Sequence, residues 1–283
     1  MPERLPRRRP LVLMHHGFTD RPRADDPEGL FVTLSALEAQ LDQLLNRGWR
    51  ALDLDGYLSA LSSASRARRA FLLTMDDGFA SVTGVAEPLR RRGVPAVLFV
   101  PTELVGRTAA WLPHPADEPL LDGGELRQLS ASGIEIGVHG LDHRPMTGLD
   151  DAELRRQCLE ARTCLADLVG RPPRAFAYPY GVFDRNAQRA VEAAGYQIAF
   201  SVHDDAGRFA ISRVDVNAFD TLLSFRLKTL PPYRRMWRLA GHLGPLRRAV
   251  NRAVNQRSSS HPSGACSDAY PERPQRPGKR KAW

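Results

Sequence analysis

The sequence predicts an α/β fold in which a parallel sheet or barrel is covered by helices. Short apolar runs alternate with segments whose apolar residues recur at helical spacing, and no internal repeat breaks this order. Strands separated by helical segments are typical of parallel sheets, because each parallel pair needs a crossover connection. Of the 283 residues, 42% are apolar and 25% are charged, which is ordinary usage for a folded chain. The longest near-apolar run, residues 94–101, is far shorter than the ~20 residues of a membrane-spanning helix.

The first half of the chain contains three expected strands and two expected helices. Each strand is a short apolar run, and each helix has apolar residues at helical spacing and ends at a glycine. In chain order we expect a strand at residues 11–14, a helix at 33–47, a strand at 71–75, a helix ending near residue 92, a strand at 95–100 and a long loop at 102–121.

The second half continues the alternation, and polar residues gather where strands end. We expect helices at 124–131, 150–169 and 184–194, and strands at 134–138, 175–178, 197–202 and 211–216. Ligand sites of parallel α/β folds lie at the carboxyl ends of the strands. Five strand ends therefore predict one site: His15-His16, Asp76-Asp77, His139, Tyr180 and His203.

The net charge of +8 is concentrated at the two ends of the chain. Residues 1–10 carry +3 and residues 231–283 carry +10, so the rest of the chain carries −5. A nucleic-acid-binding protein more typically has its basic face on the folded body, so we expect no nucleic acid partner. No apolar stretch of signal-peptide length follows the N-terminal arginines, which predicts a cytoplasmic protein without a secretory signal.

The chain beyond residue 230 differs in character from the part before it. Residues 233–255 contain six arginines and no acid, interleaved with apolar side chains. This segment suits peripheral contact with an anionic membrane, or alternatively a solvated or core-packing helix. We divide the chain into a basic arm (1–10), a catalytic domain (11–230), a basic amphipathic segment (231–255) and a disordered tail (256–283).

Two pairs of polar residues suggest a metal site. Asp76 and Asp77 are adjacent, and holding both ionised requires a cation or hydrogen bonds nearby; a turn or helix cap accounts for the pair alone equally well. His139 and His143 are four residues apart, which places both on one side of a helical turn; such pairs are also common on surfaces. Together, one carboxylate and two imidazoles form a three-ligand set with open positions for water and substrate, and the second carboxylate is left to act as a base.

Three motifs in series resemble those of the polysaccharide deacetylases, the NodB-homology family (carbohydrate esterase family 4). Residues 74–78, Thr-Met-Asp-Asp-Gly, resemble its Thr-Phe-Asp-Asp-Gly motif. Residues 139–143, His-Gly-Leu-Asp-His, are similar to its His-Ser/Thr-x-x-His motif, and residues 176–181 are similar to its third motif around Pro-Tyr-Gly. The resemblance covers about residues 10–230 and implies an irregular (β/α) barrel.

The resemblance also implies a reaction and roles for its residues. Asp77, His139 and His143 would hold a divalent metal, expected to be Zn²⁺. Asp76 would be the general base, and the backbone N–H of Tyr180 would stabilise the oxyanion. The implied reaction removes N-acetyl groups from an amino-sugar polysaccharide or its lipid-linked precursor. Two alternatives stay open: a deformylase or amidase of the same fold acting on a smaller substrate, and an inactive glycan-binding domain.

The general acid is less clear from the motifs. The family usually has it in a late Leu-x-His motif, which is absent after residue 203. Residues 11–17 are similar to the opening Leu-x-Tyr-His segment of a circularly permuted branch, which implies that His16 is the acid and that His15 stands in the tyrosine position. His203 is the rival candidate.

The chain departs from the family pattern at two positions. Ala177 stands where an arginine commonly braces the base, so Arg174 or Arg213 would have to reach in from elsewhere. Gly140 replaces the Ser/Thr of the histidine motif, which removes one loop hydrogen bond. Among the aromatic residues, Trp49, Phe99 and Phe176 are expected to pack in the core or loops. Trp111, in the long loop, is the best candidate to contact a sugar.

Overall fold

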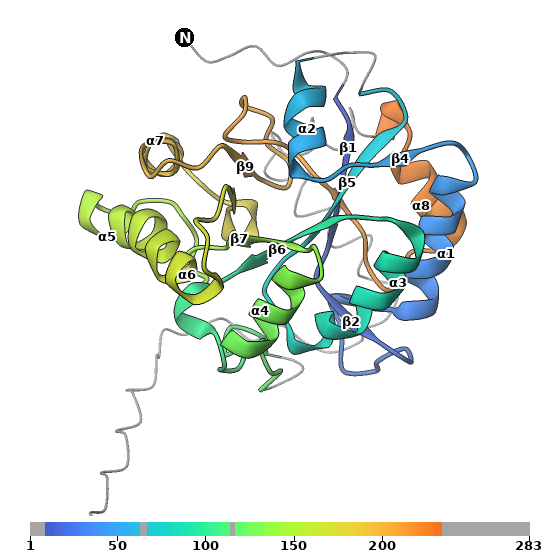
Figure 1. Cartoon of the computed structure of the whole chain (residues 1–283), viewed down its shortest axis with the longest axis horizontal. Coiled ribbons are helices and arrows are strands. Elements are labelled where there is room, and N and C mark those ends of the chain that lie inside the picture. The colour runs from blue at the N-terminus through green and yellow to red at the C-terminus, as the bar shows by residue number, and fades with distance from the viewer. Residues whose placement is uncertain (1–8, 63–66, 114–116, 234–283) are drawn as a thin grey trace, which may run out of the picture.

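A curled parallel sheet forms the centre of the molecule. The computed structural model describes residues 9–62, 67–113 and 117–233, and the predictions made for residues 1–8 and 234–283 lie outside these ranges. Within the described residues, eight strands form one parallel sheet that curls into a half-barrel, with helices packed around it (Figure 1). The predicted α/β barrel architecture is therefore confirmed.

The sheet runs in the order β10-β1-β5-β6-β7-β8-β9, and β4 pairs with the start of β5. All seven strands expected from the sequence take part. The first strand lies between the last strand and β5, because Leu13 pairs with both Val214 and Leu73. The strands are β1 (Leu11–His15), β4 (Arg50–Ala51), β5 (Ala70–Met75), β6 (Ala96–Val100), β7 (Glu135–Val138), β8 (Ala175–Ala177), β9 (Ile198–Phe200) and β10 (Val214–Asp215).

The two faces of the sheet are both buried, as the uninterrupted apolar strands require. Along β5, Phe71 and Leu73 belong to the large cluster beneath the helices, whereas Leu72 belongs to a smaller cluster inside the barrel. Phe99 fills this interior opposite Gly137, where an added Cβ would lie 2.6 Å from the Phe99 ring. Glycine at position 137 therefore lets β7 approach the ring closely.

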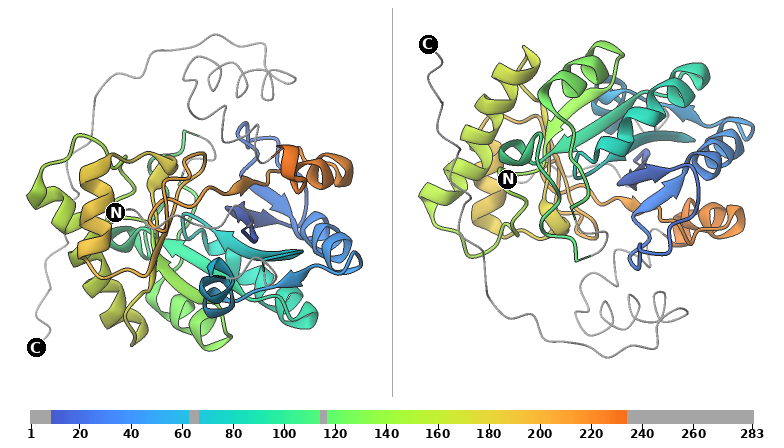
Figure 2. Two further views of the ribbon diagram at one scale, coloured as in Figure 1. Left: turned by 90° about the horizontal axis from the view of Figure 1, so that it is seen from above. Right: turned by 90° about the horizontal axis from the view of Figure 1, so that it is seen from below.

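Helices cover the sheet between successive strands, and Figure 2 shows them on the outside of the half-barrel. Thr33 caps the first helix by accepting a hydrogen bond from the backbone N–H of Ala36. The helices are α1 (Leu34–Leu45), α2 (Leu54–Leu61), α3 (Ala86–Arg92), α4 (Gly123–Ala131), α5 (Asp151–Arg155), α6 (Ala161–Val169), α7 (Arg185–Ala193) and α8 (Leu222–Lys228).

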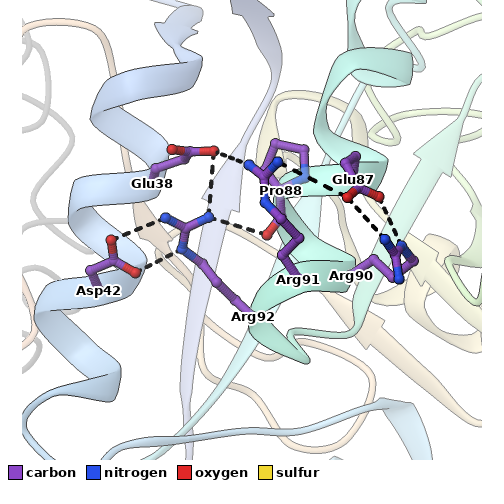
Figure 3. A network of polar contacts seen from close by, with 7 residues as sticks. All are labelled: Glu38, Asp42, Glu87, Pro88, Arg90, Arg91 and Arg92. Carbon is purple, nitrogen blue, oxygen red and sulfur yellow. Dashed lines mark hydrogen bonds and ion pairs between the residues drawn. The ribbon is translucent and has the colours of Figure 1, made fainter.

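An ion-pair network joins α1 and α3 on the outer surface (Figure 3). Arg92 donates two hydrogen bonds to Asp42, at 2.7 and 3.0 Å, and Arg91 donates one to Glu38, at 2.9 Å. Because these side chains are partly exposed, each pair contributes at most ~1 kcal/mol. The network orients α3 against α1 and lies apart from the site described below.

Several elements differ from the sequence predictions. The helix expected at residues 150–169 contains a π-helical turn at Arg156–Glu160, which separates α5 from α6. The patterns did not predict α2, α8, β4, or the small ribbon formed by β2 (Gly17–Thr19) and β3 (Phe31–Thr33). These elements are short, and α2 contains a glycine, so their periodicity is weak. None of the helices within the described ranges combines the length and hydropathy of a bilayer-crossing segment.

Candidate active site

A cavity of about 360 Å³ opens where the strands end. The carboxyl ends of parallel strands meet at one edge of the sheet, and side chains from all five predicted strand-end clusters come together there. The residues predicted from these clusters that line the cavity are His16, Asp76, Asp77, His139, Tyr180 and His203. His15 does not line it and is buried beside Phe18, its ring centroid 5.8 Å from that ring.

Three buried side chains converge in this cavity with the donor set of a metal centre. Asp77 Oδ1 lies 3.3 Å from His139 Nε2 and 3.0 Å from His143 Nε2. One ligand atom from each residue lies within 4.8 Å of the other two. One carboxylate and two imidazoles suit Zn²⁺ or a similar divalent cation.

A hydrogen bond outside the triad orients His139. Its Nδ1 lies 2.8 Å from the carbonyl oxygen of Ala177. Because a carbonyl can only accept, Nδ1 carries the proton and Nε2 of the neutral ring keeps its lone pair. That lone pair points toward Asp77, which is the arrangement that metal-binding histidines usually have. The residues present therefore fit a divalent metal.

The two histidines do not lie on a helical turn, contrary to the sequence prediction. Residues 139–145 form a loop in which Gly140 and His143 have positive φ, +72° and +64°. Gln157 Oε1 accepts a hydrogen bond from the backbone N–H of Leu141, and a Cβ at position 140 would lie 3.0 Å from the same oxygen. The close approach of Gln157 and the left-handed backbone explain why glycine replaces Ser/Thr at position 140.

Left-handed backbone is concentrated around the cavity. Asp77, His143 and Tyr180 have φ of 72°, 64° and 57°, and they are three of the five non-glycine residues with positive φ in the described ranges. Such conformations are unfavourable for residues with a Cβ and persist where the surrounding structure enforces them. Their concentration here marks this edge of the sheet as the functional end of the barrel.

A buried arginine holds the second carboxylate. Arg213 Nη1 and Nη2 donate to the two carboxylate oxygens of Asp76, each at 2.6 Å. Arg213 also donates from Nε to the carbonyl of Ser201 at 3.0 Å and from Nη1 to Thr74 Oγ1 at 3.2 Å. Burial alone raises the pKa of Asp76, but the Arg213 guanidinium, with smaller contributions from His139 and His16, outweighs burial, so the pKa lies below its usual value. Asp76 is therefore ionised at neutral pH and fixed in orientation.

Comparison with known proteins identifies the family. The sequence profile of the polysaccharide deacetylase family matches residues 63–199. Residues 63–199 of this chain belong to the polysaccharide deacetylase family. It is 22% identical over 213 residues to the protein YxkH of Bacillus subtilis (strain 168), covering 73% of this chain and 71% of YxkH.

Solved structures of deacetylases share the fold. The polysaccharide deacetylase BC0361 from Bacillus cereus superposes with a TM-score of 0.64 at 19% identity, covering 77% of this chain and 68% of BC0361. The Streptococcus pyogenes deacetylase PplD, solved in complex with acetate, gives a TM-score of 0.68 at 16% identity over 82% of this chain and 100% of PplD. At these identities the likeness shows the fold alone.

The structure accounts for the missing arginine of this deacetylase. Ala177 lies on β8 and belongs to the apolar cluster inside the barrel, and Arg213 reaches Asp76 from the residue before β10. Arg174, the other candidate, instead pairs with Glu135 and Asp55, at 3.1 and 2.6 Å. The brace of Asp76 therefore comes from a different strand than the family motif implies.

Both candidate acids of the deacetylase lie at the cavity. His16 follows β1 and His203 follows β9, and each is partly buried in the cavity wall. His16 shares this cavity with Asp76 and Asp77, and a positive charge on it would lower the pKa of both carboxyls, though less than their closer partners do. His16 can therefore reach the same substrate group as the two carboxylates.

Aromatic side chains form one wall of the cavity. Trp111 stacks on His143 with ring centroids 4.0 Å apart, and the edge of Tyr180 meets the same imidazole at 4.7 Å. Trp111 is thus positioned to contact a substrate, as its place in the long loop suggested. Phe99 and Phe176 pack in the core, and Trp49 packs against it.

Two carboxylates that line the cavity, Glu28 and Asp215, are not predicted from the sequence. Arg213 is one of the two arginines that the sequence offers as a brace for Asp76, and the structure selects it. The sequence does contain a signal for the role of Arg213. This arginine lies within the apolar strand pattern at residues 211–216, and an arginine buried in a strand requires a charged partner. Glu28 belongs to the unpredicted β2–β3 region and has no comparable signal.

Proposed function

We propose that the chain is a metal-dependent hydrolase that removes N-acetyl groups from an amino-sugar polysaccharide or its lipid-linked precursor. The observation that carries this proposal is the cluster of Asp77, His139 and His143 beside the braced carboxylate of Asp76, all in one cavity. Hydrolysis of an amide needs a nucleophilic water, a base, an acid and stabilisation of negative charge on oxygen. The cavity offers a candidate for each.

Asp77, His139 and His143 are the residues that would hold the metal, and we propose Zn²⁺ because the set combines two imidazoles with one carboxylate. A divalent metal bound there polarises a carbonyl and lowers the pKa of water. The chain itself contributes the orientation of the ligands, since His139 is fixed by the Ala177 carbonyl and Trp111 covers one face of His143.

Asp76 is the proposed general base. Its two oxygens are held by Arg213, and the residue is buried next to the triad, so it is ionised and oriented before substrate binds. In this position it would accept a proton from the attacking water. The chain of contacts from Ser201 through Arg213 to Asp76 prevents the carboxylate from turning away.

His16 is the proposed general acid, and it would donate a proton to the amide nitrogen as the bond between that nitrogen and the acetyl carbon breaks, which releases the amine and acetate. Its support is its place in the cavity wall and its electrostatic influence on Asp76 and Asp77. The backbone N–H of Tyr180 is the proposed donor to the oxyanion, and its left-handed conformation lies at the edge of the cavity.

This geometry weakens the inactive alternative and leaves the deformylase or amidase open. An alanine at position 177 would favour an inactive glycan-binding domain if the base had no brace, but Arg213 provides the charge that the family motif places there. A deformylase or amidase would use the same residues, so the products must separate it from a deacetylase.

The test measures metal and product together. The purified protein is analysed for bound metals, then given an N-acetylated and an N-formylated amino-sugar oligosaccharide, and released acetate and formate are quantified. We expect about one divalent ion per chain, acetate release that stops on chelation, and recovery when Zn²⁺ is returned. Absence of both metal and hydrolysis would favour the glycan-binding alternative, and preferential release of formate would favour the deformylase.

A further inference from the structure

An apolar patch on α8 and the turn before it is left exposed by the fold. Six large apolar side chains in the described ranges are exposed, and five of them lie in this short stretch. Leu223 and Leu227 are four residues apart on one side of α8, and Leu230 comes two residues after the helix ends, whereas Phe225 on the opposite side of the helix is fully buried. The patch consists of Phe219, Leu222, Leu223, Leu227 and Leu230, which are 43–65% exposed.

Residues that adjoin the patch also line the cavity of the candidate active site. The ring of Phe219 packs over Gly29, where an added Cβ would lie 2.7 Å from it, and the neighbouring Glu28 lines the cavity. On the other side, Lys228 of α8 donates to the carbonyl of Asp215, which also lines the cavity, at 3.0 Å. Figure 2 shows α8, in orange, at the edge of the molecule. A surface that binds the patch would therefore lie next to the cavity entrance.

Positive charge accompanies the exposed leucines. Asp220, the acid at the start of the patch, is bound by Lys228 at 2.6 Å. From residue 222 to residue 255 the sequence contains eight basic residues and no acidic one. Arg226 on α8 is exposed, and the basic sequence continues directly after the patch. Exposed apolar side chains next to a basic sequence are the combination that binds anionic lipid surfaces.

We propose that the α8 patch docks the protein on an anionic lipid bilayer, with the exposed leucines inserted among the headgroups. A second copy of the chain is a poorer occupant, because a symmetric interface over the patch would bring the exposed Arg226 of both copies together. The lipid surface satisfies both features of the patch at once. One last step rests on the proposed function: in the membrane-bound protein, the cavity would face sugars attached to membrane lipids.

The experiment uses the full chain and two kinds of vesicle. Co-sedimentation is measured with phosphatidylglycerol–phosphatidylcholine vesicles and with phosphatidylcholine vesicles alone, at increasing salt. The wild type should bind the anionic vesicles and be released as salt rises. Leu223→Ser combined with Leu227→Ser should weaken binding about tenfold or more. The matched variant, Leu223→Phe with Leu227→Phe, should bind as well as the wild type, because a bilayer requires apolar character and no particular shape.

Measurements of activity, oligomeric state and thermal stability keep the outcomes distinct. Acetate release from a soluble oligosaccharide should be equal in all three proteins, so a loss of catalysis cannot be mistaken for a loss of binding. Unchanged vesicle binding by the serine variant would overturn the proposal. A wild-type dimer in solution that the serine variant abolishes, without vesicle binding, would assign the patch to self-association instead. A large fall in thermal stability of the serine variant with vesicle binding retained would show that the patch packs against the protein's own chain.

Discussion

Arg213 and Asp76 form a bidentate ion pair inside the barrel, across 137 positions of sequence. Both side chains are almost fully buried, so neither charge is solvated by water. Breaking such a pair by removing one partner leaves an uncompensated buried charge, which costs ~3–5 kcal/mol. The pair therefore links the stability of the barrel to the orientation of the proposed base.

Arg213→Met is expected to lower kcat about 100-fold with little change in KM, because the carboxylate loses its orientation and its ionised state is no longer favoured. Steady-state kinetics on an N-acetylated oligosaccharide measure this. Arg174→Met is the matched control, since Arg174 forms partly exposed pairs with Glu135 and Asp55, and it should stay within about twofold of wild type.

A double variant separates the contribution of Arg213 to stability from its contribution to catalysis. Arg213→Met with Asp76→Asn removes both charges and should recover much of the lost stability while activity stays absent. Ala177→Arg with Arg213→Ala returns an arginine to the family's usual position and should recover part of kcat, because position 177 faces the same interior. Wild-type kcat in Arg213→Met would show that Asp76 needs no brace.

His139→Ala should lose bound metal and activity together, since it removes one of three ligands and the only one fixed by the Ala177 carbonyl. Elemental analysis and acetate release check this on the same preparation. His203→Ala, which changes a cavity residue that is not one of the three ligands, should keep its metal. Full metal occupancy in His139→Ala would place the metal elsewhere.

His16→Ala should lower kcat by ~10²–10⁴ and retain the metal, because it removes a proton donor and no ligand. His203→Ala should cost far less. The discriminating measurement is the pH dependence of kcat, whose limb on the alkaline side should vanish in the variant that lacks the acid. Near-normal activity of His16→Ala beside an inactive His203→Ala would reverse the assignment.

The sequence predicted the location of the site better than its internal geometry. Polar residues at five strand ends were sufficient to predict the cavity, because parallel strands bring their carboxyl ends together whatever their order. The conformation of residues 139–143 was not predictable, since it depends on Gln157, which approaches Gly140 from a different element. Likewise, Arg213 could be assigned to Asp76 only once the sheet order placed β10 beside β1.

His15 should make the protein less stable in mild acid. Burial lowers the pKa of His15 to about 4, against 6.5 when unperturbed, so the unfolded chain takes up a proton at higher pH than the folded one. The stability contributed by the neutral ring is fully present above pH 6.5 and is lost as the pH falls from 6.5 toward 4. At about pH 5 the loss of folding stability is roughly 2 kcal/mol.

His15→Phe keeps a ring beside Phe18 but cannot be protonated, so it should lack this acid-dependent loss of stability. Urea unfolding of both proteins at about pH 7.5 and pH 5 gives the comparison, in which contributions common to both chains, such as carboxylates and bound metal, cancel. An identical decrease in the free energy of unfolding for wild type and His15→Phe would mean that His15 is already protonated, or hydrated, in the folded state.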